Sequence, residues 1–247
     1  MNLKTVRFSL SAAIKERVMR HYQIPFSCTG LDPGIVNFLP KNAPINLVDI
    51  GASSGEFARA VESYCGIRNA LLVEPQPARI AELVTHFPSE KIILRECAMS
   101  DKDGFAEMDV LNWHYSSSLL RVKRDIAGVD KILNLEVCER IKVRVQKLDN
   151  VMAEVPWRAE VVDLVKLDVQ GSEFAVLLGA QDTLQRTRMV WTEVAFRPMY
   201  EGAASFSDIH SFMYQLGFVL LWILQGFRGD GGELLEGDAL FARGTGV

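Results

Sequence analysis

The sequence predicts an α/β fold whose main sheet has seven strands, mostly parallel, with an antiparallel last strand. Short apolar runs of strand length alternate with amphipathic helical patterns, and this alternation is typical of βαβ units with parallel strands. The last two apolar runs flank a glycine-rich turn, GFRGDGG at 226–232, which predicts an antiparallel hairpin at the end of the sheet. A chain of 247 residues with this pattern commonly forms one domain rather than two.

Each element follows from a local pattern. Apolar runs typical of buried parallel strands occupy residues 45–50, 70–74, 91–97, 161–169, 189–196, 218–224 and 238–243. Apolar residues at helical spacing predict helices over 55–65, 75–87, 172–185 and 206–217. Extra strands are predicted over 104–111 and 139–148, inside the connection between the third and fourth strands of the sheet.

The segment before the first strand differs from the rest of the chain. Apolar residues recur at helical spacing over 10–22, and a passage rich in Pro and Gly then interrupts regular structure. We therefore expect an N-terminal helix and lead-in over 1–44. The main domain is expected over 45–247, with inserted strands at about 104–147.

Composition excludes several classes of protein. The net charge of -4 lacks the basic excess of chains that neutralise many phosphates, so no nucleic-acid partner is expected. The cysteines lie far apart and form no C-x-x-C pair, which gives no sign of a zinc or redox site. No apolar run approaches the roughly 20 residues that a membrane span needs. We expect a cytoplasmic protein without stable membrane insertion.

The strongest local signal is the segment VDIGASSGEF at 48–57. An apolar strand ends at an aspartate, a glycine-rich turn lets a ligand approach the backbone, and a helix begins. The G-x-x-x-G spacing differs from the G-x-G-x-x-G of sites that bind a pyrophosphate. Residues assigned to a cofactor here are Asp49, Gly51, Ala52, Ser53, Gly55 and Phe57. A tight strand-to-helix turn without a ligand is the alternative.

Glu74 follows the second predicted strand, where an acidic side chain can accept hydrogen bonds from both hydroxyls of a ribose. An adenosine-containing cofactor is therefore expected, with Pro75 at the same strand end. On its own, Glu74 is equally explained as a solvated turn residue. Cys97 and Ala98, at the end of the third strand, are in position to contact an adenine ring.

The segments DIGASSGEF, VEP, SSSLL, KLDVQGSE and LLGAQDTL together resemble the FkbM family of methyltransferases, over most of residues 45–243. The resemblance implies a class I methyltransferase fold, which is Rossmann-like, and S-adenosylmethionine as cofactor. It also implies that the methyl acceptor is a hydroxyl group of a sugar, a polyketide or another natural product. The family's fourth-strand motif reads approximately K-I-D-V-E-G-A-E. Here Gln170 stands where the family often has Glu, and Ser172 where it often has Ala.

Methyl transfer to a hydroxyl needs a base near the methyl group, because the oxygen loses its proton as the bond forms. Asp168, at the end of the fourth strand, is expected either to be that base or to position the ammonium group of the cofactor. Glu193 is a second candidate, unless it is a structural partner of Arg197. His114 is a third, because histidine transfers protons near neutral pH; the alternative is an exposed loop residue.

The expected reaction is metal-independent O-methylation of a small-molecule or glycan acceptor. Ser118, with Ser117 beside it, matches a serine-containing segment of the family and is assigned a cofactor or substrate contact. Trp113 and Tyr115 either stack on an acceptor ring or mark the surface of a homodimer. Two other classes remain open: a noncatalytic protein that binds S-adenosylmethionine, and an NAD-binding oxidoreductase. The glycine spacing and the lack of a Y-x-x-x-K pair argue against the latter.

Overall fold

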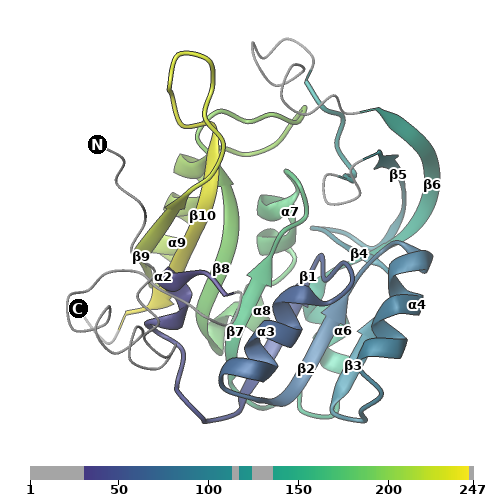
Figure 1. The fold of residues 1–247 in the computed structure, drawn as a ribbon, viewed down its shortest axis with the longest axis vertical. Coiled ribbons are helices and arrows are strands. Elements are labelled where there is room, and N and C mark those ends of the chain that lie inside the picture. Colours follow the sequence, from purple (N-terminus) through teal and green to yellow (C-terminus); the bar gives the residue numbers. More distant parts are fainter. Residues whose placement is uncertain (1–30, 113–116, 124–135, 245–247) are drawn as a thin grey trace, which may run out of the picture.

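The central sheet has seven strands in the order β3-β2-β1-β7-β8-β10-β9 (Figure 1). The computed structural model describes residues 31–112, 117–123 and 136–244. The strands of the sheet are β1 (Ile45–Ile50), β2 (Ile67–Val73), β3 (Ile92–Arg95), β7 (Val162–Leu167), β8 (Thr187–Ala195), β9 (Phe218–Gln225) and β10 (Glu236–Arg243). The first five strands in this order pair in parallel, whereas β10 is antiparallel to both β8 and β9. The predicted sheet is confirmed.

Helices cover both faces of the sheet (Figure 1). One face packs against α2 (Pro33–Val36), α3 (Glu56–Tyr64) and α4 (Pro77–His86). The other face packs against α6 (Leu148–Glu154), α7 (Glu173–Leu178), α8 (Gln181–Gln185) and α9 (Phe206–Gln215). The N-terminal helix predicted over 10–22 lies outside the described residues.

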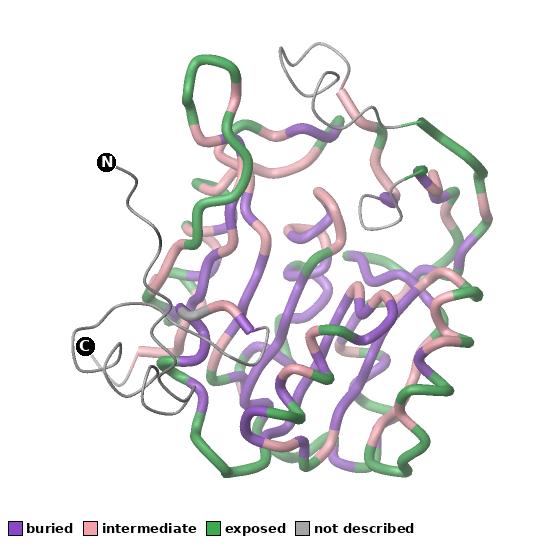
Figure 2. The backbone as a smooth tube through the Cα atoms, in the orientation of Figure 1, coloured by how far each residue is buried: buried purple, intermediate pink, exposed green. Residues whose placement is uncertain are grey.

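Alternation along the central strands supplies side chains to both cores. In β1, Ile45 and Leu47 pack on the side of α2, α3 and α4, and Val48 and Ile50 pack on the opposite side. Successive side chains in a strand point to opposite faces, so a strand covered on both faces is apolar throughout. Figure 2 shows β1, β2 and β7 as largely buried traces in the middle of the molecule. This double burial explains why their sequences are mostly apolar, with only a few polar positions such as Asp49 and Lys166.

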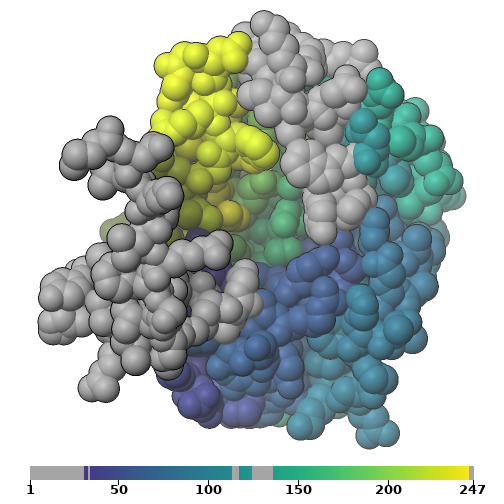
Figure 3. Space-filling model, viewed as in Figure 1, coloured from purple at the N-terminus to yellow at the C-terminus, as the bar shows by residue number. Residues whose placement is uncertain are grey.

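The inserted strands form a sheet of their own. β4 (Ala98–Met99), β5 (Gly104–Leu111) and β6 (Val137–Gln146) pair in the order β4-β6-β5. The two predicted extra strands are thus present, but they do not extend the main sheet. Figure 3 shows them on one side of the molecule, in teal, and the β9–β10 hairpin on the other side, in yellow.

One predicted helix was wrong, and one helix was not predicted. The helix predicted over 172–185 is two short helices, α7 and α8, because the chain turns at Gly179. A Cβ atom at Gly179 would overlap the backbone carbonyl of Ser100, so the glycine allows a close approach between two segments that are distant in the sequence. The helix α6 was not predicted, because its residues had been divided between the end of a strand and a connection.

None of the helices in the described part of the chain has the length and apolar character needed to cross a membrane.

Candidate active site

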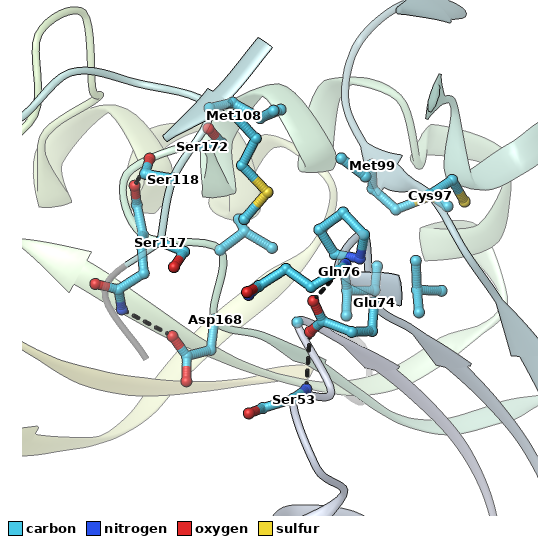
Figure 4. A pocket seen from close by; sticks show the side chains of 18 residues that line it. Ser53, Glu74, Gln76, Cys97, Met99, Met108, Ser117, Ser118, Asp168 and Ser172 are labelled. Atoms are coloured by element: carbon cyan, nitrogen blue, oxygen red, sulfur yellow. Dashed lines mark hydrogen bonds between the residues drawn. The ribbon is translucent and has the colours of Figure 1, made fainter. Parts of the chain in front are cut away.

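A cavity lies at the C-terminal ends of β1, β2 and β7. β1 has β2 on one side and β7 on the other, so the strand order reverses here, and open α/β sheets bind ligands at such a point. Figure 4 shows the side chains that surround the cavity. The predicted cofactor residues that line it are Gly51, Ser53, Glu74, Pro75, Cys97, Ala98, Ser118 and Asp168.

The turn between β1 and α3 depends on a glycine at its first position. Gly51 has a φ of 77°, and a Cβ atom there would overlap the backbone carbonyl of Asp168. The amides of Gly51 and Ala52 both donate to the carbonyl of Val73 at 3.0 Å. The turn is therefore held between the ends of β2 and β7. Any side chain at position 51 would push the ends of β1 and β7 apart.

Glu74 is buried beside the cavity, and backbone amides hold both of its carboxylate oxygens. The amide of Ser53 donates to Oε2 and that of Gln76 to Oε1, each at 2.9 Å (Figure 4). Burial raises the pKa of Glu74, and these hydrogen bonds oppose the rise because they stabilise the charged form. A carboxylate oxygen has two lone pairs, so each can accept one more hydrogen bond. Glu74 is thus oriented to accept two hydroxyl groups.

One end of the cavity is lined by sulfur and methyl groups. Cys97, Ala98 and Met99 contribute to it, together with Met108 from β5. Figure 4 shows Cys97 and Met99 across the cavity from Asp168. Burial raises the pKa of the Cys97 thiol to about 11, so this thiol is neutral at physiological pH. Soft, uncharged surface of this kind is favourable for contact with an aromatic ring.

Lys166 on β7 lies beneath the β1–α3 turn. Its Nζ donates to the Gly51 carbonyl at 2.8 Å and lies 3.3 Å from Asp49 Oδ1 and 3.5 Å from Asp168 Oδ2. Burial alone would lower the pKa of Lys166, but the two carboxylates raise it above its usual value. The ammonium group therefore stays charged and connects β1 to the end of β7.

A single side chain, Gln170, joins Asp168 to Glu193. The Asp168 side chain lines the cavity and is 45% exposed. Gln170 Nε2 donates to Asp168 Oδ1 at 2.9 Å and to Glu193 Oε2 at 3.1 Å. The hydroxyl of Tyr200 donates to Gln170 Oε1 at 2.8 Å. Glu193 does not line the cavity, but the amide places it directly behind Asp168.

Glu193 is also part of an acidic group on β8 and β10. Glu236 and Asp238 lie near it on β10, and Asp238 is directly opposite it in the strand pair. Burial, together with the neighbouring carboxylates, raises the pKa of Glu193, and raises those of Glu236 and Asp238 to about 7. This acidic group therefore ionises less readily than exposed carboxyl groups do.

Other predicted site residues lie outside the lining of the cavity. Asp49 is fully buried behind the turn, and Ala52 and Phe57 pack with the core on the α3 side of the sheet. Gly55 is the N-terminal cap of α3, with a φ of 85°. His114 lies outside the described residues. Direct contact with a cofactor or substrate remains a prediction for these five residues.

Sequence reasoning gave no role to Lys166 or Tyr200. A lysine inside an apolar strand is a usable signal, because an unpaired ammonium group is costly to bury and a carboxylate partner must lie nearby. Tyr200 offers no such signal, since it is 30 residues from Gln170 and the fold alone brings the two together.

Comparison with known proteins relates this site to a family. The methyltransferase FkbM domain matches residues 49–220. The chain belongs to the FkbM methyltransferase family. Its cofactor is S-adenosylmethionine, and its seven-stranded sheet with the antiparallel β10 is that of a class I methyltransferase. The matched range begins at Asp49 and includes Glu74, Asp168, Gln170 and Glu193.

This FkbM methyltransferase is similar to the 2-O-methyltransferase NoeI of Sinorhizobium fredii, with 28% identity over 186 residues, 72% of this chain and 74% of that protein. Among solved structures, it is similar to the magnesium protoporphyrin IX methyltransferase ChlM of Synechocystis with bound S-adenosylmethionine, with a TM-score of 0.48 and 9% identity over 98% of this chain and 87% of that chain. Fibrillarin of Aeropyrum pernix, also with bound S-adenosylmethionine, gives a TM-score of 0.46 and 13% identity over 83% of this chain and 69% of that chain.

Proposed function

We propose that this FkbM methyltransferase transfers a methyl group to a hydroxyl of a sugar or another small natural product, with Asp168 as the general base. The observation that carries the proposal is the position of Asp168, a partly exposed carboxylate that lines the same cavity as the buried Glu74. A general base must come within hydrogen-bonding reach of the acceptor oxygen. The place of Asp168, at the end of the cavity away from Cys97 and Met99, supports this role (Figure 4).

The lining of the cavity supports a definite placement of S-adenosylmethionine. Glu74 suits the two ribose hydroxyls, because each of its oxygens can accept one further hydrogen bond. The end lined by Cys97, Ala98 and Met99 suits the adenine ring. The methionine end of the cofactor then lies toward Gly51 and Asp168, which agrees with the position of the proposed base.

When bound, S-adenosylmethionine supplies an electrophilic methyl group. The chain's task is to hold the acceptor oxygen in line with that group and to take its proton. Asp168 Oδ1 is held by Gln170, whereas Oδ2 faces Lys166 at 3.5 Å. The exposed side of Asp168 lets the proton leave to water.

Asp168 and Glu193 suit different roles. Burial and neighbouring carboxylates raise the pKa of Glu193, so it is better suited to hold a proton than to release one. Asp168 faces Lys166, whereas neither Glu193 nor Glu236 has an ion pair with a Lys or Arg among the described residues. The alternative role for Asp168, binding the ammonium group of the cofactor, would also depend on the negative charge of its carboxylate. His114 remains a third candidate base.

The charges at the acceptor end favour an uncharged acceptor. Glu193, Glu236 and Asp238 lie close to Asp168, and a cluster of carboxyl groups offers no positive charge to attract an anion. This supports a neutral glycan or small molecule as the acceptor rather than nucleic acid. The 2-O-methyltransferase NoeI, to which the chain is similar, supports a hydroxyl as the group that is methylated.

The experiment is a screen with labelled S-adenosylmethionine against neutral glycosides, each paired with its phosphorylated or carboxylated counterpart. We expect label on a hydroxyl of a neutral glycoside or related small molecule, identified as a methyl ether by mass spectrometry, and weaker transfer to the anionic counterpart. Transfer to amines alone would contradict O-methylation. Tight binding of S-adenosylmethionine with no transfer to any acceptor would favour a noncatalytic binding protein.

A further inference from the structure

Gln170 has an unusual backbone conformation for a residue with a side chain. Its φ is 56°, in the left-handed region that glycine adopts more readily. The next residue, Gly171, also has a positive φ, of 95°, and a Cβ atom there would press against the ring of Tyr200. A strained, non-glycine residue beside an active site is a reason to look for a function of its side chain.

The side chain of Gln170 joins groups from three separate segments. Its Nε2 donates to Asp168 Oδ1 at the end of β7 and to Glu193 Oε2 on β8, at 2.9 and 3.1 Å. Its Oε1 accepts from the Tyr200 hydroxyl at 2.8 Å. Its backbone carbonyl accepts from Ser118 Oγ at 2.6 Å, which also ties the loop to the inserted segment.

Only one orientation of the amide satisfies these partners. The two ionisable acceptors lie on the Nε2 side, and the phenol that donates lies on the Oε1 side. If the amide rotated by half a turn, its oxygen would face two carboxylate oxygens. The two carboxyl oxygens therefore select the orientation in which the amide protons point at Asp168 and Glu193, and the Tyr200 hydroxyl then donates to Oε1.

A neutral amide is chemically suited to this position. Asp168 and Glu193 would repel each other if both were charged and nothing lay between them. The two N–H groups of an amide satisfy one oxygen of each without adding charge, whereas a carboxylate at position 170 would add a third negative group and provide no donor. Lys166 contacts Asp168 from the other side, at Oδ2, so both oxygens of Asp168 have fixed directions.

We propose that Gln170 is a positioning residue, which sets the orientation of the Asp168 carboxylate at the methyl-transfer site by bridging it to Glu193, while the Tyr200 hydroxyl holds the oxygen end of the amide. The inference rests on the proposed function, in which Asp168 acts on the acceptor hydroxyl. A base displaced by about 1 Å can lose on the order of 100-fold in rate, so loss of the bridge should appear in the chemical step.

The key variant is Gln170→Gly. Glycine accepts the φ of 56° without strain, so the substitution removes the amide and keeps the backbone conformation. A matched control is Asn42→Gly, because Asn42 has a φ of 59° and lies outside the lining of the cavity. Gln170→Glu, measured in EDTA, keeps the shape of the side chain and removes its donors. Tyr200→Phe removes only the hydroxyl that donates to the amide oxygen.

The first measurement is the side-chain amide signal of Gln170 in the NMR spectrum of the ¹⁵N-labelled full chain, assigned by its loss in Gln170→Gly. In the wild-type chain we expect this pair of amide protons to resonate downfield of a free glutamine side chain and to exchange slowly with water. Their chemical shifts should change in Asp168→Asn and in Tyr200→Phe but not in Asn42→Gly. A Gln170 amide with the shifts and exchange of a free glutamine side chain would overturn the inference. This measurement requires no methyl acceptor.

The second measurement separates turnover from binding. With the best acceptor from the glycoside panel, we expect Gln170→Gly and Gln170→Glu to lower kcat about 10- to 100-fold, with the Kd for S-adenosylhomocysteine and the melting temperature within the range of the control. Unchanged kcat in Gln170→Gly, beside a large loss in Asp168→Asn, would reject the positioning role alone. Unchanged kcat in Asp168→Asn would reject the proposed base and the positioning role with it.

Discussion

Lys166 and Asp49 are direct neighbours across β1 and β7, and Nζ of the lysine lies 3.3 Å from Oδ1 of the aspartate. Asp49 is fully buried, and Lys166 is its charged partner among the described residues. Burial raises the pKa of Asp49, and the ammonium group opposes that rise. The pair lies under the turn that carries Gly51, so its charge balance supports the shape of the cofactor site.

Replacing Lys166 with Met should destabilise the fold strongly. The substitution keeps the apolar length of the side chain and leaves the buried Asp49 without its countercharge, a change that typically costs about 3–5 kcal/mol. Denaturant unfolding followed by circular dichroism measures it. The exposed Lys91→Met is the matched control and should fall within about 0.5 kcal/mol of wild type. Adding Asp49→Asn to Lys166→Met should recover part of the lost stability. Equal stability of Lys166→Met, Lys91→Met and the double variant would contradict the charge argument.

Removing the carboxylate of Glu74 should weaken cofactor binding. Glu74→Ala is expected to raise the Kd for S-adenosylhomocysteine by about 10- to 150-fold, which corresponds to about 1.5–3 kcal/mol for lost charged hydrogen bonds. Calorimetry measures it, and NAD should show no comparable affinity for the wild-type chain. Glu82→Ala, on the exposed side of α4, is the control. An unchanged Kd in Glu74→Ala would remove Glu74 from the ribose site.

The positions of Gly51 and Glu74 could be predicted because each depends on one strand end, and the ends of buried parallel strands are visible as apolar runs. The bridge from Asp168 through Gln170 to Glu193 and Glu236 could not, because it depends on the register of the β8–β10 pair and on a turn at Gln170 with positive φ. The break at Gly179 was missed for a similar reason, since its cause is a contact with Ser100.

Asp168→Asn should lower turnover at least about 100-fold, the lower range for loss of a general base, and leave the fold intact because the amide is nearly the same shape. The Kd for S-adenosylhomocysteine tells which role applies. An unchanged Kd with lost turnover supports the base. A parallel loss of affinity would make Asp168 a ligand of the cofactor's ammonium group and move the search for the base to Glu193 and His114.

Stability should decrease as the pH rises from about 5 through neutrality. Burial and neighbouring carboxylates raise the pKa of Glu236 and Asp238 to about 7, above the value of about 4 expected in the unfolded chain. The folded state therefore binds more protons between these values, and the stability gained at low pH is lost as the pH rises through the folded-state pKa. The free energy of unfolding of the apo protein, measured from pH 5 to pH 8, should fall.

Glu236→Gln should flatten this decline, because it removes one of the groups that must ionise in a buried position. The exposed Glu139→Gln is the control and should keep the wild-type slope. A rise in stability from pH 5 to pH 8 in the wild-type chain would contradict the raised pKa values of the acidic group on β8 and β10.

The final prediction is that methyl transfer does not require a divalent cation. A metal that held the acceptor hydroxyl would need several oxygen ligands at one point. Among the residues that the structure describes, no group of three or more His, Cys, Asp or Glu side chains is arranged to hold a metal ion. Asp168 and Glu193 face the same amide, and the N–H groups of Gln170 point at both, which is where a cation that bridged them would have to lie.

Turnover of a confirmed acceptor should therefore survive exhaustive EDTA treatment and should not increase with added magnesium, manganese or calcium. Gln170→Glu is the informative contrast, because it replaces the amide donors with a third carboxylate, and calorimetry should detect tighter manganese binding by this variant than by wild type. Loss of wild-type activity in EDTA that one of these ions restores would contradict the prediction. It would make Asp168 and Glu193 metal ligands, and the amide of Gln170 would then have to turn away from them when the ion binds.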